Sequence, residues 1–120
     1  MTERQTTLRK RDRVTHQHDI EEIFADNIRS GSAYLRVLYR PTHSGKQRLG
    51  ISASRKVGNA VTRNRYKRLI RDFFRLNRDL FPMGDIMIVI GQKASELDNT
   101  MFREKLANEL NRLQRKAKSS

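Results

Sequence analysis

The sequence contains no cysteine and no long apolar run. Without cysteine, a disulfide framework and a zinc site built on thiolates are both excluded, and a reducing compartment fits this composition. The longest apolar run, residues 86–90, is much shorter than the roughly 18 residues that a membrane helix requires. The first residues are polar and basic, with no hydrophobic centre typical of a secretion signal. We therefore expect a soluble cytoplasmic protein that does not enter a membrane.

Acidic residues are scarce: 13 Asp and Glu stand against 26 Lys and Arg, which leaves a formal net charge of +13. Self-repulsion of this size disfavours a compact chain unless a polyanion is usually nearby. Nucleic acid is the most common such partner, and an anionic membrane surface is the alternative. Residues 1–13 carry much of the excess with little apolar content. They are expected to form a flexible basic arm ahead of a single domain over residues 14–118.

The hydrophobic patterns predict an α+β domain, a two-layer sandwich with element order α-β-β-β-α-β-α and a short first strand. Thr15 is a plausible cap for the first helix. The two strands that follow the short one are expected to pair as a hairpin. A last helix, begun near residues 98–100, presents a core stripe at helical spacing. The expected elements are an apolar helix face at Ile20, Ile23, Phe24 and Ile28, strands at 34–40, 48–54 and 86–90, a helix at 59–80, and a helix whose core stripe is Phe102, Leu106, Leu110 and Leu113.

The helix expected at residues 59–80 has two opposite faces. At 100° per residue, one arc is apolar and the other is cationic over about 22 Å. Arginine binds phosphate through its planar fork, and the capped first turn near Asn59 could hold one more phosphate. Between residues 63 and 75 the only carboxylate is Asp72, whereas a solvated helix face usually mixes both signs. The apolar arc holds Tyr66, Leu69, Ile70, Phe73, Leu76 and Leu80, and the cationic arc holds Arg63, Lys67, Arg71, Arg75 and Arg78, flanked by Asn64 and Arg68.

One segment is specific enough to suggest a family. Ser54-Arg55-Lys56-Val57-Gly58-Asn59-Ala60-Val61, followed by Arg63-Asn64-Arg65 and Lys67-Arg68-Leu69-Ile70-Arg71, resembles the RNR motif of the bacterial ribonuclease P protein component. The similarity extends over nearly the whole chain. It implies a protein subunit that binds ribonuclease P RNA and precursor tRNA and assists removal of the 5′ leader, with Mg²⁺ held by the catalytic RNA. It also implies a left-handed β-α-β crossover.

The resemblance assigns residues to two surfaces. One contacts the catalytic RNA, and the other is a cleft that holds the single-stranded leader. A shallow face with aromatic rings suits single strands, because bases stack on rings without sequence readout. The alternative for Ile20 and Phe24 is ordinary core packing. The RNA-contact set is Lys56, Asn59, Arg63, Asn64, Arg65, Lys67, Arg68 and Arg71, and the cleft set is Ile20, Phe24, Tyr39, Ser52 and Arg55.

Two stretches depart from the family pattern. Gly91-Gln92-Lys93 stands where the family commonly has one or two basic residues after the last strand. His16-Gln17-His18 replaces more basic residues, and two histidines two positions apart do not share a helix face. We therefore expect no metal site in the protein.

The sequence offers no catalytic site of its own. Its carboxylates are scattered, and it has neither a phosphate-binding glycine loop nor a nucleophile elbow. We expect no catalytic residue in the protein and no small-molecule substrate. The main alternative is a ribosomal or ribosome-associated structural RNA-binding protein. A metal-dependent nuclease that acts alone and a membrane-binding protein are weaker alternatives.

Overall fold

The computed structural model describes residues 10–42 and 45–119. The predicted order of elements is confirmed. Short 3-10 turns at Lys10–Asp12, Arg55–Val57, Arg78–Leu80 and Gln92–Glu96 join or precede the main elements. These are α2 (Gln17–Ala25), β1 (Ile28–Gly31), β2 (Leu35–Arg40), β3 (Gln47–Ala53), α3 (Ala60–Leu76), β4 (Gly84–Ile90) and α4 (Asn99–Ser119).

The four strands form one sheet in the order β1-β2-β4-β3. The hairpin expected between β2 and β3 is wrong, because β4 lies between them, antiparallel to β2 and parallel to β3. Its residues are apolar on both faces, so β4 gains most from the central position, where both faces are covered. The hairpin partner of β2 is the short strand β1, in which Ile28 lies opposite Tyr39.

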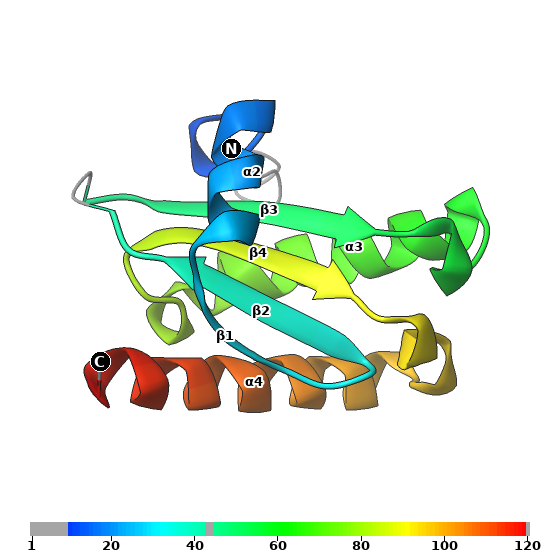
Figure 1. Cartoon of the computed structure of the whole chain (residues 1–120). Coiled ribbons are helices and arrows are strands. Elements are labelled where there is room, and N and C mark those ends of the chain that lie inside the picture. Colours follow the sequence, from blue (N-terminus) through cyan, green and yellow to red (C-terminus); the bar gives the residue numbers. More distant parts are fainter. Residues whose placement is uncertain (1–9, 43–44, 120) are drawn as a thin grey trace, which may run out of the picture.

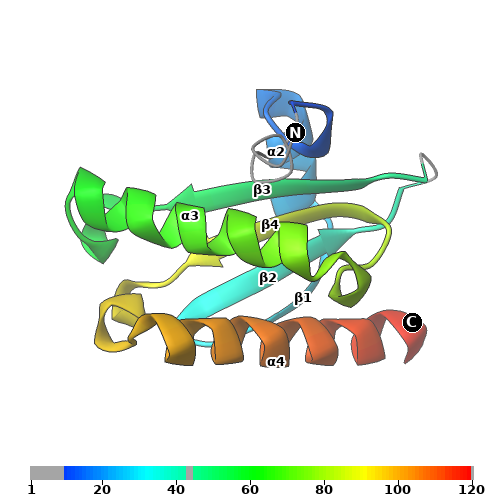
Figure 2. The same cartoon turned by 180° about the vertical axis from the view of Figure 1, so that it is seen from behind.

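Helices cover the two faces of the sheet unequally. α3 and α4 lie side by side on one face, and the short α2 lies across the other (Figures 1 and 2). In Figure 1, β3 and β4 both run to the right, β4 lies below β3, and α3 returns behind the sheet. This path is a left-handed crossover, as the family resemblance implied and against the usual right-handed preference.

The main core lies between the sheet and the pair of helices α3 and α4. Tyr66 of α3 is buried there, and its hydroxyl donates a hydrogen bond to the carbonyl of Ala94 at 2.9 Å. Asp98 caps α4 by accepting from the backbone N–H of Met101 at 2.8 Å. The predicted core stripe of α4 is confirmed, since Phe102, Leu106, Leu110 and Leu113 are all 0% exposed.

The end of α3 differs from the prediction. The helix stops at Leu76 rather than near residue 80, and Asn77 is its C-cap. Leu76, expected in the core, is 67% exposed, whereas Phe74 is fully buried. The ring of Phe74 packs edge-on against that of Phe81, which follows the turn after α3, with the ring centroids 4.7 Å apart. Phe74 therefore takes the buried position that was expected for Leu76. Arg78 therefore leaves the cationic row.

The segment before α2 is folded onto the sheet. Val14 is buried, and residue 13, expected in a flexible arm, forms a β-bridge with Leu49. Asp12 pairs with Arg78 at 3.2 Å. The proposed cap Thr15 is also incorrect: His16 is the N-cap of α2 and makes no side-chain hydrogen bond there. Residues 1–9 of the expected arm lie outside the described part of the chain.

Candidate nucleic-acid interface

The outer face of α3 carries most of the residues expected to contact RNA. α3 attaches to the protein through five buried side chains, Tyr66, Leu69, Ile70, Phe73 and Phe74. The opposite side of the helix is therefore left to polar and charged residues. Of the expected set, Lys56, Asn59, Asn64, Arg65, Arg68 and Arg71 are exposed, and Arg63 and Lys67 are half-buried.

Asn59 begins this helix as expected. Its Oδ1 accepts a hydrogen bond from the backbone N–H of Thr62 at 2.9 Å, which is the geometry of an N-cap. Arg63 lies one turn further on, and one of its guanidinium nitrogens is 3.4 Å from the Gly58 carbonyl. The RNR motif thus starts at a well-defined helix end.

The cations of α3 are not neutralised by the described part of the protein. Throughout residues 10–42 and 45–119, no carboxylate lies within ion-pair distance of a Lys or Arg of α3. Arg65 lies over the ring of Tyr66 at 5.3 Å, which leaves its N–H groups accessible. Because phosphate binding would break no internal ion pair, this face is suited to a polyanion.

A small pocket of about 200 Å³ connects α3 with the other side of the sheet. It lies along the exposed edge of β3 and is lined by Lys67 and Arg71 of α3 and by Arg13 and Thr15 of the segment before α2. The Nε of Arg13 is buried and has no hydrogen-bond partner in the described protein. Arg13 therefore joins the basic surface, although sequence reasoning placed it in the arm.

A second surface lies on the face of the sheet that carries α2. The strand register places Arg36 of β2 opposite Val89 of β4, and Val89 beside Ser52 of β3. We call these three residues the open row. The next row inward, with Leu38 and Met87 at its centre, packs against Ile23 of α2. Figure 1 shows that α2 leaves the end of the sheet at the carboxyl ends of β3 and β4 uncovered.

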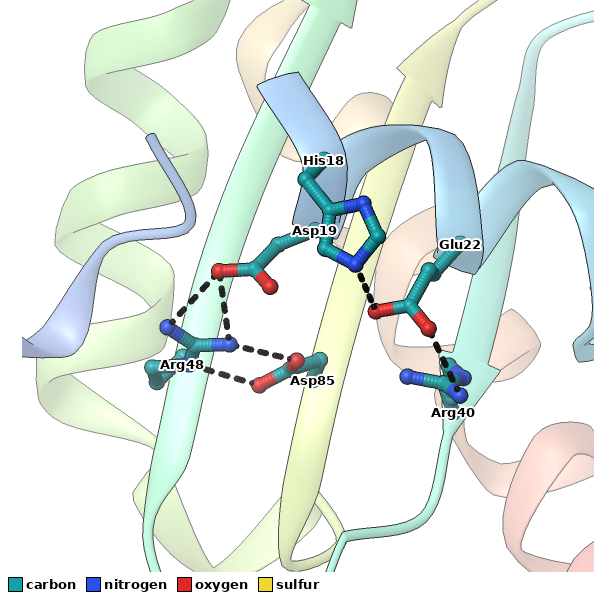
Figure 3. Close-up of polar contacts among 6 residues, drawn as sticks. All are labelled: His18, Asp19, Glu22, Arg40, Arg48 and Asp85. Carbon is teal, nitrogen blue, oxygen red and sulfur yellow. Dashed lines mark hydrogen bonds and ion pairs between the residues drawn. The ribbon is translucent and has the colours of Figure 1, made fainter. Parts of the chain in front are cut away.

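Ion pairs hold α2 to the other end of this face (Figure 3). Arg48 of β3 binds Asp85 of β4 through two hydrogen bonds of 2.8 and 2.7 Å, and its guanidinium also reaches Asp19 of α2 at 3.4 Å. The hydrogen bond to Asp85 is the main cause that raises the pKa of Arg48, so this residue remains a cation. Glu22 of α2 makes a second link, to Arg40 of β2 at 3.4 Å.

The cleft residues are divided between the two faces of the sheet. Phe24 of α2 is 45% exposed, so the core-packing alternative does not hold for its ring. Ile20 is half-buried against the small core under α2, and Ser52 belongs to the open row. Arg55 is exposed in the turn that leads from β3 to α3.

Tyr39 does not lie on this surface. Its ring packs in the main core on the opposite face, together with its strand neighbours Leu35 and Val37, and its hydroxyl donates to the carbonyl of Met83. Burial raises the pKa of the Tyr39 hydroxyl. The alternation of side chains along β2 determines this, because Arg36 and Leu38 take the other face. Arg36 and Val89 are surface residues that sequence reasoning missed, and the same alternation could have identified Arg36.

The described residues contain no group of three or more side chains suited to hold a metal ion. His18, one of the two histidines considered in the sequence, pairs with Glu22 on the same helix at 3.3 Å. No helix in the part of the chain that is described is both long and apolar enough to cross a membrane.

Comparison with known proteins identifies the family. The model of the ribonuclease P family matches residues 8–114. The chain belongs to the ribonuclease P protein family. It is 36% identical to the ribonuclease P protein component of Geotalea uraniireducens, over 92% of this chain and 97% of the relative. It is 37% identical over 110 residues to that of Thermotoga maritima, covering 88% of this chain and 94% of the relative.

Solved ribonuclease P proteins share the fold. The protein from Thermotoga maritima superposes with a TM-score of 0.76 at 37% identity, covering 83% of this chain and 96% of the other. The Staphylococcus aureus protein gives a TM-score of 0.79 at 28% identity, covering 83% of this chain and 93% of the other. This chain is therefore a protein subunit of ribonuclease P, with a role in maturation of tRNA 5′ ends and ribonuclease P RNA as its partner. The ribosomal alternative is not favoured.

Proposed function

We propose that the chain binds ribonuclease P RNA through the outer face of α3. We propose also that it binds the 5′ leader of precursor tRNA on the face of the sheet that carries α2, around the open row; we call this face the open side of the sheet. The observation that carries this proposal is the row of cations on α3 that no carboxylate of the described protein neutralises. Arginines held at a rigid helix can bind successive phosphates of a folded RNA without first breaking contacts of their own.

The open side of the sheet suits a single strand. Phe24 of α2 is exposed, and Ser52 and Val89 lie side by side on the face of the sheet that carries α2. A base can stack on such a ring whatever its identity, which fits leaders of different sequence. Arg36 and Arg55 place positive charge at opposite ends of this surface, where they can contact the strand's phosphates.

In this proposal the protein positions RNA and does not cleave it. Asp19, Glu22 and Asp85, the carboxylates that link α2 to the sheet or lie beneath it, pair with arginines, and the described residues contain no metal-ligand group. Cleavage is assigned to the RNA and its Mg²⁺, in the bacterial cytoplasm. Neutralisation of several phosphates by the protein lowers the concentration of Mg²⁺ that the RNA needs, and this effect weakens as salt rises.

The test is cleavage of a precursor tRNA by a bacterial ribonuclease P RNA at low Mg²⁺. The wild-type chain should restore cleavage, and Arg68→Glu should reduce its affinity for the RNA about tenfold, because one phosphate contact becomes a repulsion. Arg103→Glu is the matched control, since Arg103 is an exposed arginine on α4 outside both surfaces. No stimulation by the wild-type chain, or cleavage by the protein without RNA, would overturn the proposal.

A further inference from the structure

A basic pocket lies at the edge of the sheet farthest from β3. It has a volume of about 370 Å³ and is formed by β1, the turn that follows it, one residue of β2 and one of α4. No residue of the RNR motif takes part, and β1 and β3 are the two opposite edges of the sheet. The residues that line the pocket are Arg29, Ser30, Gly31, Ser32, Arg36 and Lys116.

Three cations from three elements converge on this pocket. The pairing of Arg29 with Leu38, and of Gly31 with Arg36, places Arg29 and Arg36 on the face of the sheet that carries α2. Lys116 reaches the pocket from α4, on the other face, and its Nζ donates a hydrogen bond to the carbonyl of Arg29 at 2.7 Å. The positive charge therefore surrounds the edge of the sheet.

Gly31 keeps the pocket open between Arg29 and Arg36. A Cβ at this position would lie 2.6 Å from both Cα and Cγ of Arg36, closer than van der Waals contact allows. Any larger residue would displace the Arg36 side chain. The remaining lining residues of β1 and its turn, Ser30 and Ser32, are small.

Among the described residues, no anion faces this pocket. Glu109, which bonds to the lining residue Ser30, is 4% exposed and is also bound by Arg112 at 3.4 Å. In the described parts of the chain, no carboxylate lies within ion-pair distance of Arg29, Arg36 or Lys116. This contrasts with Arg40, four residues from Arg36 on the same face of β2, which is paired with Glu22.

We propose that this pocket binds the phosphodiester backbone of RNA, as a contact site separate from α3. Arg36 belongs both to the pocket and to the open row, so a single strand that crosses the open row reaches the pocket without leaving the surface. The occupant is either a distal part of the precursor leader or a segment of ribonuclease P RNA, since both present the same phosphates. The proposal rests on the proposed function only for the identity of these RNAs.

The experiment compares Arg29→Glu with Arg103→Glu in the full-length chain. Both are exposed arginines and both changes reverse one charge, and Arg103 lies about 20 Å from Lys116 along α4, at 1.5 Å per residue. Binding at several salt concentrations is measured for the protein with ribonuclease P RNA, and for the holoenzyme with precursors that have a long or a truncated leader. Thermal unfolding shows that each variant folds, and Arg36→Ala replaces Arg29→Glu if that variant does not.

Arg29→Glu should weaken binding about tenfold at low salt and reduce the slope of log affinity against log salt by about 1. A loss confined to the long-leader precursor identifies the leader as the occupant, and a loss with ribonuclease P RNA identifies that RNA. Unchanged affinity for all three RNAs, or an equal loss in Arg103→Glu, would overturn the proposal. These results do not depend on whether Arg68→Glu weakens binding to ribonuclease P RNA. The pocket at β1 and the proposed function of α3 are therefore tested separately.

Discussion

α2 and α3 are attached to the same sheet by different forces. α3 buries five side chains and is held by apolar contact, whereas α2 buries only Ile23 and adds ion pairs through Asp19 and Glu22. A helix held by its apolar face keeps its cations for a partner. A sheet that holds a helix by charge uses its cations internally, as Arg48 and Arg40 do. The location of the carboxylates therefore decides which arginines are available to RNA.

Because α2 and α3 are held by different forces, salt should weaken their attachment to the sheet to different degrees. Ion pairs at the protein surface are screened as ionic strength rises, whereas apolar burial is not weakened in this way. The contact of α2 with the sheet is therefore more sensitive to salt than that of α3. Because α2 carries Phe24, the open side of the sheet depends on this weaker attachment.

The largest effect on stability is expected from Arg48→Ala. This change leaves Asp85, whose side chain is 4% exposed, as a buried charge without its partner and also releases Asp19 of α2. Removal of one partner of a buried pair is strongly destabilising, and we expect a loss of about 3 kcal/mol in the free energy of unfolding. Chemical denaturation measures it.

Arg68→Ala on α3 is the control for this comparison. Arg68 is exposed and has no ion-pair partner in the described protein, so its removal should change stability by less than about 0.5 kcal/mol. If the two substitutions destabilise the fold equally, the distinction between engaged and available arginines is incorrect.

A smaller effect, on specificity, is expected from Phe24→Ala. Phe24 is 45% exposed, so loss of its ring should leave the fold almost unchanged. Loss of one stacking contact, about 1 kcal/mol, should lower the preference of the holoenzyme for precursor over mature tRNA about fivefold. Competition binding between the two RNAs measures this ratio. Met101→Ala on α4 has the same exposed fraction and should leave the ratio unchanged, and a drop in both variants would argue against a role for the ring.

The apolar attachment of α3 and α4 was predictable from the sequence because it is local. Positions such as Ile70 and Leu106 repeat at helical spacing, and that period alone assigns them to the core. The caps at Asn59 and Asp98 were predictable for the same reason, since a cap acts within one turn. The cationic face of α3 follows from the same helical geometry.

The attachment of α2 was not predictable because it is non-local. Arg48, Asp85 and Asp19 come from three elements that are far apart in the sequence, and no period relates them. The order of the strands has the same origin: β4 enters the sheet between β2 and β3 only after the chain has formed α3. Tyr39 is different, since the alternation along β2 places its ring with Leu35 and Val37, and the family resemblance led to the wrong face.

Small effects on stability are expected at the N-cap residues of the two helices. Asn59→Ala removes the hydrogen bond to the N–H of Thr62 and should cost about 1 kcal/mol of stability, as N-cap substitutions typically do. His16→Ala should cost almost nothing, because the His16 side chain caps no backbone group of α2. Urea denaturation of both variants measures the difference.

The reverse change separates capping from docking as the cause of where α2 begins. His16 has the extended backbone, with φ of −76° and ψ of 132°, that an N-cap residue adopts, so His16→Asn can supply the missing acceptor. We expect a gain of about 0.5 kcal/mol in the same measurement. No gain would mean that the ion pairs of Asp19 and Glu22 already hold the first turn of α2, and that this helix, unlike α3, owes its start to the sheet beneath it.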